Sequence, residues 1–394
     1  MNNLKPRSTR IEVVDALRGF AVMAILLVHS LEHFIFSVYP EASSQPQWLN
    51  TLDDTVFSII FTLFAGKSYA IFALLFGFTF YIQYNNQQNK GKDFGPRFLW
   101  RMILLLAFAT LNAAFFPAGD VLLLFAIVSI FLFAVRKWSN TTILITAIIF
   151  LLQPIEWFHY FASNIIPNYS IPDLNVGEMY AAISKNTKEG TFVEFIVKNI
   201  NLGQKASLFW AIGAGRFLQT AGLFLLGYLI GRKKLFLNSV ENTHFGVKAL
   251  IVSAILFAPI NALADIFLND DSKIISSSIG VILDMWQKFA FTFVLISAFV
   301  LAFYHTAFKD KTKNLQLYGK MSLTNYITQS ISGALIYFPF GLYLAPYCGY
   351  TASLLIGILF FILQIQFCKW WLKSHKQGPL EYIWHKWTWL NSTK

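Results

Sequence analysis

Residues 12–36 read EVVDALRGFAVMAILLVHSLEHFIF. The segment is apolar from Phe20 to Val28, but it carries Arg18 near one end and His29 eleven residues later. An α-helix turns by about 100° per residue, so these two side chains point within about 20° of one another and lie roughly 16 Å apart along the axis. Ionisable side chains are costly in a bilayer and usually line a cavity or a pathway. The stretch therefore predicts a membrane helix with one polar face.

The composition of the 394-residue chain indicates a polytopic membrane protein. Its hydrophobic fraction is 56% and its charged fraction 13%, which is more apolar surface than a soluble fold can bury. We expect a single membrane domain over residues 1–394, surrounded by the lipid bilayer. The net charge of +11 fits basic cytoplasmic loops better than nucleic-acid binding. Neither a nucleic-acid partner nor a metal site is expected.

Hydropathy divides the chain into about ten apolar stretches that could cross a membrane, which predicts an all-α helical bundle. The second stretch is long enough to tilt or to break near Gly66. The ten stretches are residues 12–36, 56–84, 98–116, 119–135, 141–162, 207–230, 246–268, 279–304, 321–345 and 348–372.

The loops between these stretches alternate in charge. The positive-inside rule places the basic loops and both termini in the cytoplasm, as for a multi-pass protein of the inner (cytoplasmic) membrane. Residues 12–162 then form the N-terminal helices, and residues 207–394 form the C-terminal helices and a cytoplasmic tail. Residues 163–206 are the longest external segment and are expected to form short helices over the outer face. The cations of the basic segments are Lys5, Arg7, Arg10, Lys90, Lys92, Arg97, Arg101, Arg136, Lys137, Arg232, Lys233, Lys234, Lys309, Lys311, Lys313, Lys320, Lys373, Lys376 and Lys386.

Several short motifs resemble one family. Asp15-x-x-Arg18-Gly19 resembles the opening of the YeiB/DUF418 family, which belongs to a wider group of transmembrane acyltransferases. That group includes the heparan-α-glucosaminide N-acetyltransferases and, more distantly, the acyltransferase-3 proteins. The other similar segments are Gly66-Lys67-Ser68 with Phe72 to Gly77, Arg97-x-x-x-Arg101 with Gly119-Asp120, residues 319–330 (GKMSLTNYITQS), and Gly378-Pro379-Leu380-Glu381. The segment 319–330 is the most specific match.

Two departures from the family pattern matter for the chemistry. His29 stands where the family usually shows Asn, and Asn112 stands where it often shows His. The first change creates Arg-x10-His, which resembles the acyltransferase-3 signature. One interpretation is that the exchange keeps one His and one Asn in a shared pocket. Whether His29 replaces the usual catalytic His of the family stays open.

Acyl transfer from a thioester makes three demands on a site. It needs a base for the acceptor hydroxyl or amine, donors for the oxyanion, and cations for the phosphates of the carrier. Imidazole titrates near neutral pH, so His29 is the candidate base. Asn112 offers an amide donor, and Asp120 could orient His29 or bind a sugar hydroxyl. These three are the predicted catalytic residues.

The cations of the motifs predict a site for the carrier. Arg18 can pair with Asp15, three residues earlier on the same helix, so that neither is a lone buried charge. Other cations could meet phosphates, and two amide side chains offer further donors. The expected acyl-CoA site comprises Asp15, Arg18, Lys67, Arg97, Arg101, Lys320, Asn325 and Gln329.

The resemblance and this chemistry together imply an O- or N-acyltransferase of the cell envelope. It would move an acyl group, acetyl from acetyl-CoA in the simplest case, from the cytoplasm to a sugar or glycan acceptor at the outer face. The acceptor, the acyl chain length, the choice between direct and ping-pong transfer, and the oligomeric state, a homodimer included, are left open.

Other classes account for part of the pattern. Buried Asp, Arg, His and Lys could form the proton relay or solute path of a transporter or exporter. The chain shows no inverted repeat, which is common in secondary transporters. A membrane scaffold would leave the polar face of the first helix unexplained. Structural roles are also open: His29 as a hydrogen-bonded link between helices, and Arg97 and Arg101 as headgroup anchors. Arg216 and Asp284 are interpreted as a structural pair or as part of an outer vestibule.

Overall fold

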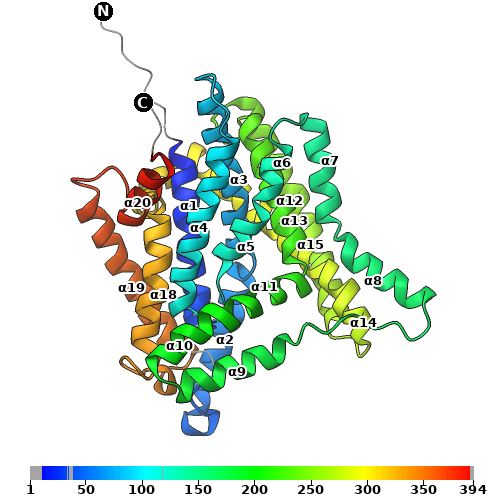
Figure 1. Cartoon of the computed structure of the whole chain (residues 1–394), viewed down its shortest axis with the longest axis vertical. Helices are drawn as coiled ribbons and strands as arrows, with labels where there is room; N and C mark the ends of the chain where they lie inside the picture. The colour runs from blue at the N-terminus through cyan, green and yellow to red at the C-terminus, as the bar shows by residue number, and fades with distance from the viewer. Residues whose placement is uncertain (1–10, 33, 35–38, 118, 391–394) are drawn as a thin grey trace, which may run out of the picture.

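The computed structural model describes residues 11–32, 34, 39–117 and 119–390, and every regular element within these ranges is a helix. Long helices stand side by side in a bundle, with the start of α1 and helix α20 at the same end (Figure 1). Helices α9 and α10 run across the bundle near the opposite end. In chain order the α-helices are α1 (Glu12–Leu31), α2 (Gln47–Phe64), α3 (Lys67–Gln88), α4 (Gly95–Phe115), α5 (Val121–Val128), α6 (Ile130–Val135), α7 (Asn140–Leu151), α8 (Pro154–Ile165), α9 (Val176–Glu189), α10 (Phe192–Lys198), α11 (Gln204–Gly213), α12 (Arg216–Arg232), α13 (Val240–Leu268), α14 (Lys273–Ile275), α15 (Val281–His305), α16 (Phe308–Lys311), α17 (Lys313–Lys320), α18 (Ser322–Tyr337), α19 (Tyr350–Trp371) and α20 (Pro379–Thr388).

Six helical segments are long and apolar enough to cross a membrane. Two further helix pairs reach that length together but bend, by 49° between α7 and α8 and by 78° between Phe192–Gly213 and α12. The described residues therefore form an all-α bundle with six to eight candidate spans, fewer than the ten expected. The six segments are Glu12–Leu31, Gln47–Gln88, Gly95–Phe115, Val240–Leu268, Lys273–His305 and Tyr350–Trp371.

Two of the ten expected spans are too short to count among these. Residues 119–135 divide at Ser129 into α5 and α6, of 8 and 6 residues. The expected span 321–345 contains α18, whose 16 residues end at Tyr337. Pro339 explains that end, because a proline disfavours helical backbone at the residue before it. Most side chains of α5 and α18 are buried by neighbouring helices, so their apolar character reflects the core of the bundle.

Two helices restart inside the bundle after a glycine. As predicted, the second stretch breaks near Gly66, which adopts φ 75° between α2 and α3. Gly215, at φ 66°, separates α11 from α12 in the same way. Glycine adopts this left-handed conformation without the steric cost that other residues incur. Each new helix begins with a cation, Lys67 in α3 and Arg216 in α12.

Helix α1 crosses α17 with the two backbones in contact. A Cβ atom added to Gly19 would collide with the carbonyl oxygen of Leu315, and one added to Gly319 would collide with that of Asp15. Only glycine fits at both positions of this crossing without a shift of the helices. The crossing places the Arg18-Gly19 motif directly against the segment that carries Lys320.

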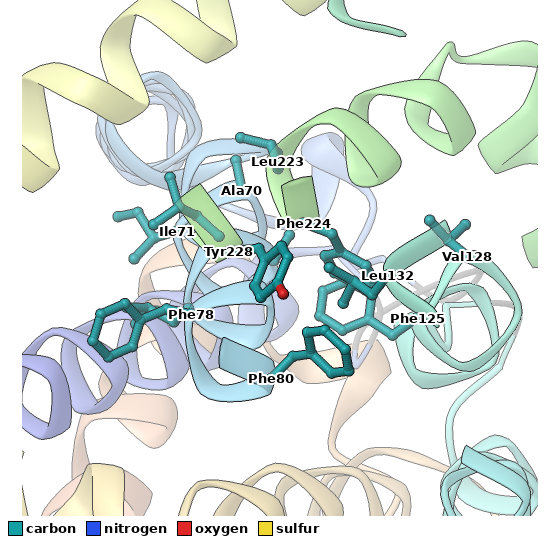
Figure 2. Close-up of a cluster of buried hydrophobic side chains, with 14 of the residues drawn as sticks. Ala70, Ile71, Phe78, Phe80, Phe125, Val128, Leu132, Leu223, Phe224 and Tyr228 are labelled. Atoms are coloured by element: carbon teal, nitrogen blue, oxygen red, sulfur yellow. The ribbon is translucent and has the colours of Figure 1, made fainter. Parts of the chain in front are cut away.

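The core between α3, α5 and α12 is rich in aromatic rings (Figure 2). Phe125 meets Phe224 edge-on at 5.1 Å between ring centroids, and Phe80 meets Tyr228 at 5.2 Å. The Tyr228 hydroxyl donates to the carbonyl oxygen of Arg136 at 2.8 Å. Aromatic pairs bury large areas and prefer such edge-on angles. This core fixes three of the elements that line the cavities described next.

Candidate active site

Two cavities lie inside the bundle and share one side chain. The first has a volume of about 310 Å³, is lined by Arg18 and Arg101 among others, and is called the Arg18 cavity. The second has a volume of about 570 Å³, is lined by His29 and Asp120 among others, and is called the His29 cavity. Tyr326 of α18 lines both. Each has the volume of a small-molecule site. The polar face of α1 is thus divided between two cavities.

Among the described residues, Thr79 and Asp15 hold Arg18 at the wall of its cavity. Its guanidinium donates to Thr79 Oγ1 at 2.9 Å and to Asp15 Oδ1 at 3.4 Å. Asp15 is buried and does not itself line the cavity, so it offsets the charge of Arg18 and positions it. Arg101 and Lys320 bring two further cations to the same lining. The structure therefore brings three of the predicted carrier residues to one place.

Arg97 and Arg101 anchor helix α20 to α4. The Arg101 guanidinium lies 3.5 Å from the centre of the Trp384 ring, whose indole N–H donates to the carbonyl oxygen of Arg101 at 3.1 Å. The Arg97 guanidinium donates to the carbonyl oxygens of Thr388 at 2.8 Å and Leu390 at 3.1 Å. Arg101 and Trp384 line the Arg18 cavity, whereas Arg97 lies outside it. Helix α20 thus closes one side of this cavity.

Glu381 joins α20 to the start of α18. Its carboxylate accepts hydrogen bonds from the backbone N–H groups of Leu323 at 2.7 Å and Thr324 at 3.1 Å. Both residues lie in the first turn of α18, where backbone N–H groups have no acceptor within the helix. Burial raises the pKa of Glu381, and the hydrogen bonds from Thr324 and Leu323 oppose that rise. His385 also lines the cavity, and burial together with Arg101 lowers its pKa below the usual 6.5. His385 is therefore protonated less readily than a free imidazole.

His29 lies among aromatic rings in the last turn of α1. Its ring centroid is 4.5 Å from that of Phe116 and 6.1 Å from that of Tyr326. Because Tyr326 also lines the Arg18 cavity, it is the side chain at which the two cavities adjoin. The imidazole of His29 thus faces the His29 cavity, and its neighbour Tyr326 also lines the Arg18 cavity.

The three predicted catalytic residues do not form a hydrogen-bonded triad. Asp120 caps α5, where its carboxylate accepts from two backbone N–H groups at 3.0 and 3.2 Å and from Asn112 Nδ2 at 3.0 Å. The Asn112 amide oxygen accepts from the Ser330 hydroxyl at 2.7 Å. Asn112 is fully buried and lines neither cavity. His29 and Asp120 face one cavity, and Asn112 supports Asp120 from behind.

Besides Asp15 and Arg97, three further predicted carrier residues lie outside the lining of the Arg18 cavity. Asn325 Nδ2 donates to the carbonyl oxygen of Tyr318 at 3.0 Å, and Gln329 Nε2 donates to the Tyr318 hydroxyl at 2.8 Å. These bonds hold α18 against α17. Lys67 is buried, with its ammonium 5.7 Å from the centre of the Phe291 ring. The structure places none of the three in the lining of the Arg18 cavity.

The sequence does not predict that Tyr326 and Lys288 line the cavities. Tyr326 lies within the segment 319–330, but a tyrosine in an apolar helix gives no signal that it borders two cavities. Lys288 lines the His29 cavity and forms an ion pair with Asp284, four residues earlier. A charge pair at this spacing inside an apolar stretch was the available signal. Arg216 lines the same cavity. No group of three His, Cys, Asp or Glu side chains in the described ranges could hold a metal ion.

The chain is similar to two bacterial proteins along nearly its whole length. It is 26% identical to "Uncharacterized protein YxaH" of Bacillus subtilis (strain 168), over 99% of this chain and 98% of that protein. It is 25% identical to an "Uncharacterized 39.9 kDa protein in amylase 3'region" of Bacillus acidopullulyticus, over 96% of this chain and 94% of that protein. No solved structure shows significant similarity.

A family match covers the C-terminal part of the chain. Residues 230–391 match the family described as "Protein of unknown function (DUF418)". The matched segment includes Tyr326 at the junction of the two cavities and Glu381 at the contact between α18 and α20. This polytopic membrane protein therefore carries a DUF418 region over residues 230–391.

Proposed function

We propose that the protein is a membrane acyltransferase that moves an acyl group, acetyl in the simplest case, from cytoplasmic acyl-CoA to a sugar or glycan acceptor at the outer face. The observation that supports this most is the pair of cavities that adjoin at Tyr326. One cavity is basic and is bordered by α20, at the end of the bundle where α1 begins (Figure 1). The other contains an imidazole. A donor and an acceptor entering from opposite sides would meet at one side chain.

The Arg18 cavity suits the carrier. Arg18, Arg101 and Lys320 would donate charge-assisted hydrogen bonds to its phosphates, which are the strongest contacts available to such groups. Phe72 and Phe98 contribute to an apolar part of the same wall, which suits an acyl chain and the arm that carries it. The cytoplasmic position of this cavity rests on the basic loops and the positive-inside rule.

His29 would act as the general base of the reaction. Its ring nitrogen would take the proton from the acceptor hydroxyl or amine while the acceptor atom attacks the thioester carbonyl carbon. The tetrahedral intermediate then carries negative charge on its oxygen, to which the Tyr326 hydroxyl would donate. When the C–S bond breaks, the acyl group stays on the acceptor and the CoA thiolate takes the proton from His29. No oxidation or reduction is involved.

Asp120 would contribute by positioning. Both of its carboxylate oxygens accept hydrogen bonds from the start of α5, and one also accepts from Asn112. These bonds fix the turn that forms part of the His29 cavity wall. Asp120 and Asn112 would therefore shape the acceptor side, and the proton transfer would fall to His29.

Release of CoA thiol from acetyl-CoA by the purified protein tests this proposal. We expect release to accelerate with at least one member of a panel of amino sugars and neutral sugars, and to be lost in His29→Ala. A transporter would behave differently: proteoliposomes would exchange a solute or respond to a proton gradient, and acetyl-CoA would be neither bound nor consumed. That result would overturn the acyltransferase and assign the same polar residues to transport.

A further inference from the structure

We infer that the His29 cavity binds an oxyanion group, a carboxylate or a phosphate, beside Arg216 and Lys288. The Arg216 guanidinium lies between two rings, 4.5 Å from the centre of Trp210 and 5.1 Å from that of Tyr69. Stacking of this kind orients the guanidinium but uses none of its N–H donors. Within the described ranges, the side chain of Arg216 has no hydrogen-bond acceptor and no carboxylate partner. Its donors are therefore available to a ligand in the cavity that it lines.

Positive charge accumulates around this position. Lys288 lines the cavity and pairs with Asp284, and Lys67 interacts electrostatically with both Lys288 and Arg216. The carboxylates that act on Lys288 are Asp284 and Glu32. Among the described residues, Glu32 and Asp120 line the same cavity, but neither carboxylate is bound to Arg216. An anionic ligand would supply a partner to this guanidinium, in a part of the bundle where an unbalanced charge is costly.

Two helix N-termini add to the positive electrostatic potential around Arg216. Helix α3 begins at Lys67 after Gly66, and α12 begins at Arg216 after Gly215. The two ends are neighbours, because the Tyr69 hydroxyl donates to the carbonyl oxygen of Arg216 at 3.5 Å. A helix N-terminus carries a partial positive charge, and broken membrane helices often direct such ends at anionic substrate groups. The cations and both helix ends therefore favour the same kind of ligand.

The ligand that fits best is the acidic group of the acceptor. This identification rests on the proposed acyl transfer, whereas binding of an oxyanion as such does not. Trp210, Tyr39 and Tyr180 line the same cavity and offer ring faces and hydroxyls to a sugar next to its charged group. The acceptor would thus be an acidic sugar or a phosphate-bearing glycan. An anionic lipid headgroup presents the same phosphate, so the experiment must separate the two sources.

Binding of small sugars to the full chain in neutral detergent, without acyl-CoA, tests the inference. The probes are glucose 6-phosphate, glucuronate and glucose. We expect both charged sugars to bind at least about tenfold more tightly than glucose. We also expect added salt to weaken the binding of both charged sugars. Arg216→Gln and Lys288→Gln should each lower the affinity for both charged sugars by about tenfold or more. Lys273→Gln is the matched control, because this exposed lysine lies outside the lining and should leave binding unchanged.

Two further arms keep the result interpretable. Arg216→Lys retains the charge but not the planar fork, so it should unfold at the wild-type temperature and bind with intermediate affinity. Binding of glucose 6-phosphate is also measured in nanodiscs of phosphatidylglycerol, which is anionic, and of phosphatidylcholine. Weaker binding in phosphatidylglycerol would mean that its headgroup competes for the site, which would support the site and identify a headgroup as its occupant. Equal binding of glucose and the charged sugars, or wild-type affinity in Arg216→Gln, would overturn the inference. Acetyl-CoA turnover without anion binding refutes this inference alone, and anion binding without acetyl-CoA binding refutes the acyl transfer alone.

Discussion

Arg18 and His29 share one face of α1, but each lines a different cavity. The helical rise separates them by roughly 16 Å, and Tyr326 borders both cavities between them. A single helix can therefore present a cation to a carrier on one side and a base to an acceptor on the other. Substitution of Arg18 should therefore weaken carrier binding, whereas substitution of His29 should slow the chemical step.

Removing a cation from the Arg18 cavity should weaken CoA binding. Lys320→Gln and Arg18→Gln should each raise the dissociation constant by about tenfold, because each removes a charge-assisted contact to phosphate. Lys313→Gln is the matched control, since this lysine lies on the same helix but is exposed and pairs with Asp310. Calorimetric titration with CoA gives the constants. Equal affinity in Lys320→Gln and Lys313→Gln would remove Lys320 from the carrier site.

Substitution of Asn112 should affect stability more than chemistry. Asn112→Ala removes one of the hydrogen bonds to the Asp120 carboxylate and leaves the Ser330 hydroxyl without its buried acceptor, so we expect a loss of about 1–3 kcal/mol in the free energy of unfolding. Turnover per folded molecule should remain above that of His29→Ala. Thermal unfolding in detergent and thiol release from acetyl-CoA measure the two effects. Ser330→Ala removes the same hydrogen bond from the other side and serves as the comparison. A stable but inactive Asn112→Ala would show that this amide acts directly in the reaction.

The crossing of α1 and α17 should tolerate no side chain. Gly19→Ala and Gly319→Ala each place a Cβ against a backbone carbonyl oxygen, so the helices must separate, at a cost of about 1–3 kcal/mol. Gly177→Ala is the control, because nothing lies within 4 Å of its added Cβ. The unfolding temperature should fall in the first two variants and stay unchanged in the third. Wild-type stability in Gly19→Ala would contradict the close approach.

Cysteine labelling tests the orientation in the membrane. Cysteines at Lys188, in α9, and at Lys311, in α16, should be labelled from opposite sides, with Lys311 on the cytoplasmic side. Both lysines are exposed, and the native Cys348 and Cys368 are buried, which keeps the background low. A membrane-impermeant maleimide applied to intact cells should therefore modify only the cysteine at position 188. Modification of both from outside would contradict the predicted topology.

The helical architecture could be predicted because its signals are local. Composition and hydropathy identify an all-α membrane bundle. The length of the second apolar stretch predicts that it tilts or breaks near Gly66, and the structure shows the break. Hydropathy cannot distinguish a helix that faces lipid from one buried by other helices. For that reason hydropathy predicts spans over residues 119–135 and 321–345, although α5, α6 and α18 are short and α5 and α18 are largely buried.

The sequence predicts residues of the candidate site only where helical periodicity shows that they lie on one face of a helix. The spacing from Arg18 to His29 is of this kind, and both residues line cavities. The contact between Arg101 and Trp384, and the position of Tyr326 between the cavities, depend on how distant helices cross. Such crossings are set by tertiary packing, which the local sequence pattern does not contain.

The most direct test of the central claim is thiol release from acetyl-CoA by the wild type and by His29→Ala, with CoA affinity measured on the same preparations. The account predicts that both bind CoA equally, because His29 lies outside the Arg18 cavity. It also predicts that His29→Ala releases thiol at least about 100-fold more slowly, as expected when a general base is removed. Release at the wild-type rate by His29→Ala, or a wild type that binds no CoA, would contradict it.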